Sequence, residues 1–318
     1  MDCHKLAKQG LAVVTAVCLI ILGSGGTANA GIQGSGFRAM AAVGRILQVD
    51  GGLIVNGVQY STDGARVTID GRVANLSELR PGDVVTINGS LSTDGTTAIA
   101  DEIAFVGDVR GVVTASDPQS GTLTVMNQTI RLTHDTVLNG AATLAVGDAV
   151  EVSGFANSAG ELVASSVQVQ KHAAKGQVRG TVAALDTNAH TFFINSLLID
   201  YDVKQVEGTL ANGAVAVVES KSESSSGGVL VAKRVKVSQA LGVADEQGDL
   251  QGLITAFVSD AEFELNGQHV IGDEHTRYTL RGQLLGPDSE GRVSGRFAAD
   301  GSLLADSIEI TQVGKGRN

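Results

Sequence analysis

The histidines are the first candidates for chemistry, because imidazole binds metals and transfers protons near neutral pH. His269 and His275 are close in the sequence, but their spacing matches neither an HExxH motif nor a zinc finger. Histidines on neighbouring strands can still hold a metal, although the spacing favours solvated side chains near a turn. His172, in the segment KHAAKG, is expected to be exposed. The remaining candidates are His134 and His190.

Recurring Asp-Gly pairs could supply carboxylates to calcium in an acidic protein. An EF-hand loop needs alternating oxygen ligands and a final Glu, and no segment provides them. Asp-Gly is also a preferred tight turn, so we expect hairpin turns, with weak calcium binding as the alternative. The pairs are Asp63-Gly64, Asp70-Gly71, Asp94-Gly95 and Asp300-Gly301.

No motif for covalent or cofactor chemistry is present in the sequence. There is no GxSxG elbow, no GxGxxG between a strand and a helix, and no selected pair of carboxylates for glycoside hydrolysis. The stretch SKSESSSGG (220–228) has the composition of a polar loop. We therefore predict that the protein is not an enzyme and has no catalytic residue, cofactor or metal.

One basic cluster and one aromatic cluster could bind ligands. Lys233, Arg234 and Lys236 form the basic cluster, which we interpret as a solvated strand face. Binding of single-stranded nucleic acid needs a basic groove with stacking aromatic rings. The chain has a formal net charge of −11 and only 3% aromatic residues, so we predict no nucleic-acid partner.

The aromatic cluster, Phe192-Phe193 with Tyr201, could form a platform for a sugar ring. Adjacent residues of a strand face opposite sides, so at least one Phe must face the core. We therefore favour a packing role for these rings. With no Trp in the chain, the rest of the core must come from Val, Ile, Leu and Ala.

The first thirty residues have the pattern of a secretory signal peptide. Lys5 and Lys8 precede an uncharged apolar run over 11–22, which is too short to span a bilayer. Small residues then lead to cleavage after Ala30, with an uncleaved anchor or lipidation as alternatives. We expect export to the periplasm or beyond the cell, and no transmembrane segment in the mature chain. The only cysteines, Cys3 and Cys18, lie inside this segment, so the mature chain has no disulfide.

Four copies of one unit follow the signal peptide. Three anchors fix the register: a glycine in the first strand, an asparagine-containing two-residue turn, and a late Ala-x-x-Ile/Val. We name the units repeat 1 (43–106), repeat 2 (109–170), repeat 3 (178–238) and repeat 4 (250–311). The glycines are Gly44, Gly111, Gly180 and Gly252, and the turns are Asn56-Gly57, Asn127-Gln128, Asn195-Ser196 and Asn266-Gly267. Between and around them we place linkers 31–42, 171–177 and 239–249 and a tail over 312–318; residues 31–42 could also be a loosely docked strand.

Each repeat is expected to contain five strands. The first bends or approaches other backbone closely at its glycine, a hairpin follows, and a connection ends in Leu-x-x-Gly-Asp. We call this segment, Leu79 to Asp83 in repeat 1 and Leu144 to Asp148 in repeat 2, the Gly-Asp connector. In repeat 1 Asn75 could cap a single helical turn before it. The fourth strand alternates, so Val150, Val152 and Gly154 face the core while Glu151 and Ser153 face solvent.

The fifth strand has a break in its alternation between the Ala and the Ile/Val of the third anchor. A strand cannot turn its apolar side chains away from the core, so an extra residue must be absorbed in a β-bulge. The predicted bulges are Asp101-Glu102, Ser165-Ser166, Lys233-Arg234 and Asp306-Ser307. This pattern predicts an all-β protein of four tandem small OB-like barrels, each a five-stranded Greek key, after a signal peptide.

The segments VNGVQY, LxxGDxVxxxG and DGxxxAxxI resemble the exported bacterial repeats catalogued as domain of unknown function 5666. The resemblance covers about 31–311 and implies an exported β-repeat protein, without a catalytic motif to transfer. Repeat 3 departs from the pattern at Asn212-Gly213-Ala214 and at Glu219. Repeat 4 departs in LLGPDSEGRVSG, which shortens its connector.

The leading hypothesis is an exported, non-catalytic cell-envelope protein that acts as a scaffold, spacer or partner-binding array. The alternative is a carbohydrate or small-ligand binder that uses an OB-type face. An envelope protein or a polysaccharide is the expected class of partner. The sequence leaves the oligomeric state and the docking of neighbouring repeats open.

Overall fold

The structure is a computed structural model that describes residues 37–49, 52–92, 97–140, 143–171, 175–222, 228–280 and 282–312. The expected signal peptide (1–30), Asp94-Gly95 and His172 lie outside the described residues. The described part contains β-strands and short 3₁₀ turns and no α-helix. None of its helical turns has the length and apolar character needed to cross a membrane. The described part of the chain is therefore all-β, as predicted.

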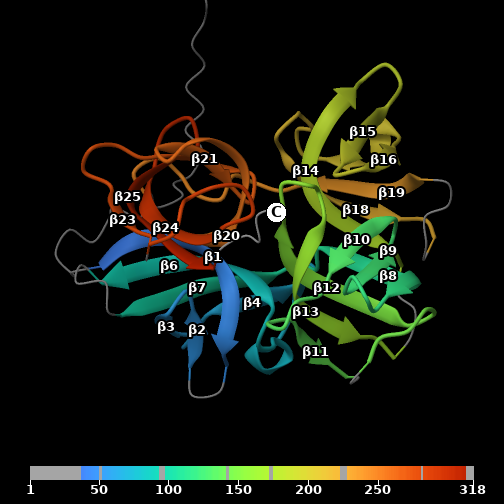
Figure 1. The fold of residues 1–318 in the computed structure, drawn as a ribbon, viewed down its shortest axis with the longest axis horizontal. Helices are drawn as coiled ribbons and strands as arrows, with labels where there is room; N and C mark the ends of the chain where they lie inside the picture. Colours follow the sequence, from blue (N-terminus) through green and yellow to red (C-terminus); the bar gives the residue numbers. More distant parts are fainter. Residues whose placement is uncertain are drawn as a thin grey trace, which may run out of the picture. The chain divides into compact units, whose positions relative to one another are not determined.

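The strands fall into four groups, for which we keep the names repeats 1 to 4 (Figure 1). Repeat 1 contains β1 (Phe37–Gln48), β2 (Leu53–Val55), β3 (Val58–Ser61), β4 (Arg66–Ile69), β5 (Arg72–Val73), the turn η1 (Leu76–Glu78), β6 (Val84–Ser92) and β7 (Ala98–Phe105). Repeat 2 contains β8 (Val109–Asp117), β9 (Thr122–Val125), β10 (Gln128–Arg131), β11 (Val137–Asn139), β12 (Ala149–Ala156) and β13 (Leu162–Val169). Repeat 3 contains β14 (Gln177–Asp186), β15 (Thr191–Ile194), β16 (Leu197–Asp200), the turn η2 (Val203–Gln205), β17 (Val206–Glu207), β18 (Val215–Ser220) and β19 (Val229–Val237). Repeat 4 contains β20 (Gln247–Ser259), β21 (Glu262–Leu265), β22 (Gln268–Ile271), β23 (Arg277–Thr279), β24 (Glu290–Phe297) and β25 (Leu303–Gln312).

The strand pairings of each repeat run in a closed circuit. In repeat 1, β1 pairs with β2, β2 with β3, β3 in parallel with β7, β7 with β6, and β6 with β1. The same order runs through β8, β9, β10, β13 and β12 in repeat 2. Repeats 3 and 4 repeat it. In Figure 1 the strands β20 to β25 curl into a small, closed, barrel-like sheet.

The last strand of every repeat contains the predicted β-bulge. In repeat 2, Ser153 pairs with Ser166 and Gly154 pairs with Ala164, so Ser165 is the extra residue. The extra residues of repeats 1, 3 and 4 are Asp101, Lys233 and Asp306. All four predicted bulges are confirmed.

A short strand that the sequence did not reveal lies beside each bulge. In repeat 4, β25 pairs with β22 at Leu303 and Leu304, and with β23 from Ser307 onward. The equivalent short strands are β4, β11 and β17. The expectation of five strands was therefore incomplete, because two to four residues leave no clear periodicity. At its bulge the last strand bends and changes its parallel partner.

Glycine faces the bulge in three repeats because the two strands approach too closely for a side chain. A methyl group on Gly154 would overlap the carbonyl oxygen of Val163. Gly89 and Gly295 hold the same place in repeats 1 and 4. In repeat 3 the position belongs to Ser220, which pairs with Ala232. The sequence comparison placed Glu219 there, one residue too early.

Three of the four hairpin turns lie where predicted, at Asn56-Gly57, Asn195-Ser196 and Asn266-Gly267. Repeat 2 requires a correction. There Val125 pairs with Gln128, so the turn is Met126-Asn127, with φ of 50° and 56°. The prediction aligned Asn127 with the first turn residue of the other repeats, whereas it is the second.

The first strands begin earlier than expected, inside the segments that were assigned as linkers. β1 starts at Phe37, so the strand alternative for 31–42 holds from that residue. β14 starts at Gln177 and β20 at Gln247. These extra residues join different repeats: β1 pairs in parallel with β20, and β8 pairs with β14.

The fourth strand of repeat 2 shows how docking between repeats modifies the alternation. Val150 and Val152 are fully buried, as predicted. Ser153, expected to face solvent, is only 1% exposed. Its Oγ accepts a hydrogen bond from the N–H of Val84 in repeat 1 (3.0 Å). A sequence read one repeat at a time cannot reveal this neighbour.

Replacing Gly154 by alanine tests the close approach at the bulge. We expect the free energy of unfolding to fall by about 1–3 kcal/mol, because the new methyl group forces the strands apart. Chemical denaturation measures this change. Gly286→Ala is the matched control, since a methyl group there meets no atom within 4 Å, and it should change stability by about 0.5 kcal/mol or less. Equal effects of the two variants would contradict the interpretation.

Glu151 tests the electrostatics of the contact between repeats 1 and 2. Burial raises the pKa of its carboxyl group, although Arg110, whose Nε lies 3.2 Å away, opposes the rise. The folded state therefore binds this proton more readily than the unfolded state, and the stability contributed by the group grows as the pH falls toward its ordinary pKa. The difference in unfolding free energy between the unsubstituted protein and Glu151→Gln should rise between pH 7 and about 4.5, by about 1.4 kcal/mol per unit of pKa shift.

A matched variant has the opposite sign. The pKa of Glu207 is lowered by its hydrogen bonds from Arg234, so the stability contributed by that carboxylate is lost as the pH falls. The difference for Glu207→Gln should therefore decrease over the same interval in urea denaturation. Parallel pH dependence of the two differences would show that burial does not control Glu151.

Candidate functional site

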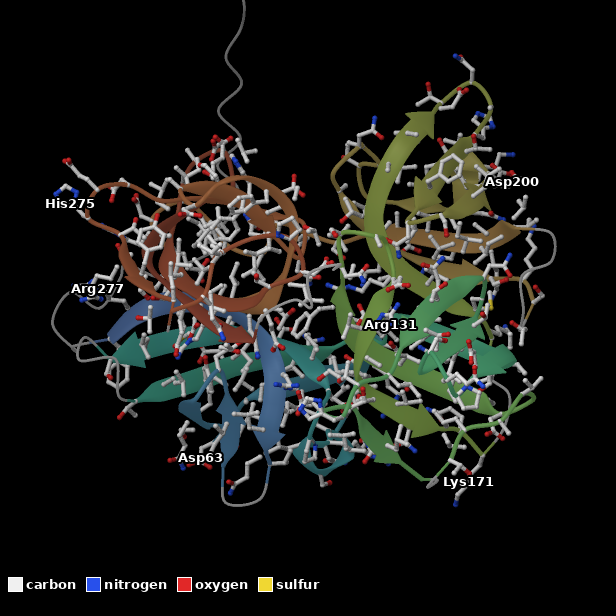
Figure 2. The ribbon with its side chains drawn as sticks, in the orientation of Figure 1. Asp63, Arg131, Lys171, Asp200, His275 and Arg277 are labelled. Atoms are coloured by element: carbon white, nitrogen blue, oxygen red, sulfur yellow. The ribbon has the colours of Figure 1, made fainter. Side chains whose placement is uncertain are left out.

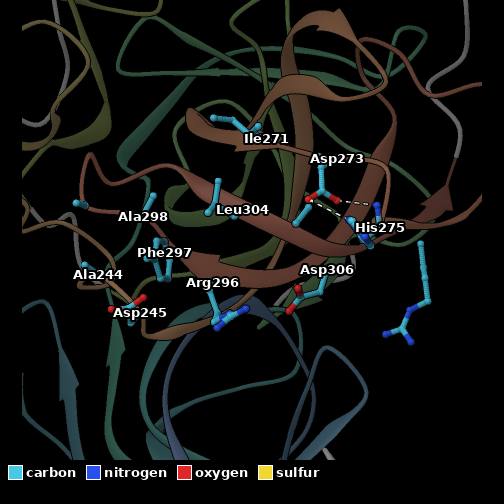
Figure 3. A pocket seen from close by; sticks show the side chains of 14 residues that line it. Ala244, Asp245, Ile271, Asp273, His275, Arg296, Phe297, Ala298, Leu304 and Asp306 are labelled. Atoms are coloured by element: carbon cyan, nitrogen blue, oxygen red, sulfur yellow. Dashed lines mark hydrogen bonds and ion pairs between the residues drawn. The ribbon is translucent and has the colours of Figure 1, made fainter.

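A hollow of about 820 Å³ opens on repeat 4 and is the main candidate for a binding site (Figure 3). Its apolar part includes Ile271, Phe297 and Leu304, and its charged part includes Asp245, Asp273, His275, Arg277, Arg296 and Asp306. Phe297 is 2% exposed, whereas Leu304 is 46% exposed. Buried and exposed apolar groups thus adjoin a charged rim, an arrangement typical of sites that bind other molecules.

The bulge of repeat 4 positions much of this hollow. Arg296 pairs with Leu304 across β24 and β25, and the extra residue Asp306 follows two positions later. Arg277 reaches the same region from β23, where it pairs with Ser307. Figure 2 shows Arg277 and His275 at the outer edge of repeat 4. The backbone feature that closes the barrel therefore also directs charged side chains into the hollow.

A local turn holds the acidic part of the rim. The backbone N–H of His275 donates to Asp273 Oδ1 (2.8 Å), and this bond is the main reason that the pKa of the Asp273 carboxyl is lowered. The side chain of His275 is 81% exposed, and its Nδ1 lies 3.8 Å from Asp273 Oδ2. The carboxylate is thus ionised at neutral pH and faces water beside a solvated imidazole.

The two histidines singled out by sequence are not brought together as metal ligands. His269 lies on β22 with its Nε2 3.5 Å from Glu262 Oε1. In the described part of the chain, no three His, Cys, Asp or Glu residues are grouped to hold a metal ion. Elsewhere, His134 pairs with its neighbour Asp135 (3.2 Å), and His190 packs on Tyr201 with ring centroids 5.8 Å apart.

The equivalent surface of repeat 2 is covered by protein. The Gly-Asp connector of repeat 1 lies on it: a methyl group on Gly82 would meet the Ser165 carbonyl oxygen at 2.9 Å and Val137 Cβ at 3.1 Å. Beside them, Val84 packs with Phe155 of repeat 2. By strand pairing, the places of Val137 and Phe155 are taken in repeat 4 by Arg277 and Arg296, which line the hollow.

A smaller cavity of about 270 Å³ lies where repeats 2, 3 and 4 meet. Its lining includes Asn157, Asn195 and Asn266. Asp108 and Arg179 also line it; their side chains form an ion pair (2.9 Å). Burial raises the pKa of Asp108 even though Arg179 opposes the rise. This cavity offers many hydrogen-bonding groups but no aromatic ring.

The aromatic platform proposed from the sequence does not form. Phe192 is completely buried and Tyr201 is 7% exposed, with their ring centroids 5.5 Å apart. Only Phe193 reaches the surface, at 36% exposure. Two of the three rings therefore belong to the core, as the packing interpretation predicted.

The basic cluster on β19 is paired with acidic side chains. Arg234 donates two hydrogen bonds to Glu207 (2.8 and 2.7 Å) and lies 3.6 Å from Glu219. Lys233 lies 3.9 Å from the same Glu219, and Lys236 is exposed. The cluster is a solvated, ion-paired strand face. Separately, Asp70-Gly71 and Asp300-Gly301 lie in the hairpin connections β4–β5 and β24–β25, as predicted. Asp63-Gly64 is a turn but not a hairpin, because β3 and β4 each pair with β7 and not with each other.

Apart from His275 and Asp306, the residues of the hollow were not found from the sequence. Arg277, Arg296 and Asp306 are far apart in the chain and match no motif, and the short strand β23 was not predicted. The one available signal was the bulge, which placed Asp306 but not its neighbours. Aligning the repeats on the bulge would have revealed the charged residues that replace the apolar ones of repeat 2.

The two adjacent phenylalanines provide a direct test of the placement of Phe192 in the core and Phe193 at the surface. Phe192→Ala should lower the free energy of unfolding by about 3–5 kcal/mol, because it leaves a cavity in the core. Phe193→Ala, one residue away, should lower it by about 1 kcal/mol or less. Urea denaturation of both variants measures the difference. A large loss for Phe193→Ala with little for Phe192→Ala would contradict the placement of these rings.

A family model described as a domain of unknown function (DUF5666) matches residues 41–104, 110–168 and 251–309, which overlap repeats 1, 2 and 4. A search of curated proteins found no match. A solved structure titled "drosophila Unr CSD456" is similar at 12% identity, over 66% of this chain and 98% of that chain, with a TM-score of 0.17, which supports no conclusion. The family model covers more than half of the chain, and the chain therefore belongs to the family of domain of unknown function 5666.

Proposed function

We propose that this protein is an exported, non-catalytic envelope protein, in which four OB-type barrels form a scaffold that binds a polypeptide partner. The observation that carries the proposal is the hollow on repeat 4, because its counterpart on repeat 2 is occupied by a polypeptide segment. Export is supported by the N-terminal sequence alone.

The OB-type assignment is supported by the order of strand pairing. Each repeat has a first strand that pairs with both the second and the fourth, and a fifth that lies parallel to the third. That order closes a five-stranded Greek-key barrel. The short strand beside the bulge occupies the connection between the third and fourth strands. A barrel of this type leaves few open edges and suits a chain built from repeated units.

A scaffold role is supported by the contacts between repeats. β1 and β20 pair from Met40 to Val43 and from Gln247 to Leu250. Repeats 2 and 3 share one continuous apolar core. Asn56 of repeat 1 donates through Nδ2 to two carbonyl oxygens. One belongs to Val43 in the same repeat (3.0 Å) and the other to Asp249 in repeat 4 (3.1 Å). Repeats held by such contacts present their surfaces in fixed relative positions.

A polypeptide is the favoured ligand of the hollow because the surface offers both kinds of contact that a peptide needs. Leu304 supplies an exposed apolar group, while Arg277, Arg296 and Asp306 can pair with backbone or charged side chains. A surface with a small apolar centre and a polar rim is typical of reversible contacts between proteins.

Binding of a carbohydrate or another small polar ligand is the second candidate function. The observation that favours it is the 270 Å³ cavity between repeats 2, 3 and 4, which is lined by several asparagines and a buried ion pair. Amide and carboxylate groups can pair with the hydroxyl groups of a sugar.

Site-directed cross-linking on intact cells tests the proposal. The mature chain expected from the sequence lacks cysteine, so Leu304→Cys can carry a photoactivatable group in the hollow. Val258→Cys, at a position that is 72% exposed, is the control outside it. We expect a protease-sensitive adduct for the first variant and none for the second. An adduct sensitive only to glycosidases, or identical adducts at both positions, would contradict a polypeptide-binding hollow.

A further inference from the structure

Two serines on repeat 2 receive the Gly-Asp connector of repeat 1. Ser166 Oγ donates to Asp83 Oδ1 (2.9 Å), and Ser153 Oγ accepts from the backbone N–H of Val84 (3.0 Å). Both serines are nearly inaccessible, at 2% and 1% exposure. The second oxygen of Asp83 accepts from the N–H of Arg80 (3.0 Å), which fixes the loop itself. The contact is thus a defined set of hydrogen bonds between one loop and one strand pair.

The same two serines recur in repeat 4. Ser294 and Ser307 pair with each other across β24 and β25, at the register that Ser153 and Ser166 hold in repeat 2. In repeat 4 both are half-buried rather than covered, and their hydroxyl groups bond to each other (2.7 Å). The equivalent pairs are Asn88 with Glu102 in repeat 1 and Glu219 with Arg234 in repeat 3. Among the four repeats, only repeat 4 shares with repeat 2 a pair of serines at this register.

The Gly-Asp connector of repeat 2 has the same internal hydrogen bond as the connector of repeat 1. Asp148 Oδ2 accepts from the N–H of Ala145 (2.7 Å), as Asp83 does from Arg80. The connector itself is uncovered: Val146 is 62% exposed, and a methyl group on Gly147 would meet no atom within 4 Å. In the part of the chain that the structure describes, the connector of repeat 2 therefore has no serine pair to dock on, and the serine pair of repeat 4 has no connector.

The charged residues beside the serines differ between repeats 2 and 4. Arg277 and Arg296 of repeat 4 replace the uncharged Val137 and Phe155 of repeat 2, so two guanidinium groups that can pair with Asp148 lie beside the serines. Asp306 at the bulge, with Asp245 and Asp273 elsewhere in the hollow, carries negative charge that opposes this attraction. The connector of repeat 3 is also open at Gly213, but it has Ala214 where the carboxylate is needed.

We propose that the Gly-Asp connector of repeat 2 in one molecule docks onto Ser294, Ser307 and the adjoining hollow of repeat 4 in a second molecule. The proposal rests on the polypeptide-binding function of the hollow and names its partner as another copy of this chain. Asp148 Oδ1 would accept from Ser307, and the N–H of Ala149 would donate to Ser294. The connector of repeat 2 and the hollow of repeat 4 are different surfaces, so association is head to tail and produces rings or filaments.

Sedimentation of the mature chain tests the association. At about 1 mM, where even an interface of millimolar Kd is substantially formed, the average mass should exceed that of the monomer and fall on dilution. Val146→Glu changes the connector of repeat 2, and Leu304→Glu changes the hollow of repeat 4. Each variant lacks one of the two surfaces, so each alone should stay monomeric. Val203→Glu, at a surface position with a similar exposure of 59%, is the control and should associate like the unsubstituted chain. Circular dichroism of each variant checks its fold.

Mixing the two inactive variants separates this arrangement from a symmetric dimer. Val146→Glu keeps the intact hollow and Leu304→Glu keeps the intact connector, so the mixture should form a dimer with one molecule of each. A monomeric unsubstituted chain at the highest concentration, association of Val146→Glu, or a mixture that remains monomeric would each overturn the proposal. A monomeric chain whose hollow still cross-links to a protein in cells would overturn self-association alone and leave the proposed function standing.

Discussion

The contact between the bulge and the glycine opposite it is the constraint on which this protein depends. At the bulge of repeat 2, the last strand comes so close to Gly154 that the Val163 carbonyl leaves no space for a side chain. The bend allows β13 to leave β10 and continue beside β11, which completes the barrel. The extra residue lies outside the pairing of the two strands, and its type differs between repeats: it is Ser165 here and Asp306 in repeat 4. One backbone feature thus closes the sheet and provides a variable surface position.

That separation between a fixed backbone and variable side chains explains how one unit serves two purposes. In repeat 2 the surface beside the bulge carries small or apolar groups and is covered by repeat 1. In repeat 4 the same surface carries arginines and an aspartate and remains open as the hollow. Internal docking and external binding are therefore alternative uses of one geometry, selected by a few substitutions. The family relationship is consistent with this, since its model matches both repeats.

Much of the fold followed from the sequence, because strand period and turn chemistry are local signals. The break between Ala164 and Val167 was enough to predict the bulge, since a shifted register would expose the core. What failed was non-local or too short to show a period. The turn of repeat 2 was placed one residue late because Met126, a buried residue, takes a turn position usually given to asparagine. Ser153 is buried only by a neighbouring repeat, and the hollow gathers residues from separate strands.

The parallel pairing of β1 with β20 also has a consequence for the order in which the chain is made. The outer edge of β1 at Met40 to Val43 receives its partner only when Gln247 to Leu250 have emerged, roughly two hundred residues later. At synthesis rates of about 5–20 residues per second, this interval lasts about ten seconds or more. An unpaired apolar edge of that kind invites pairing with other nascent chains. This edge of β1 is therefore without its β20 partner until the final repeat has been made.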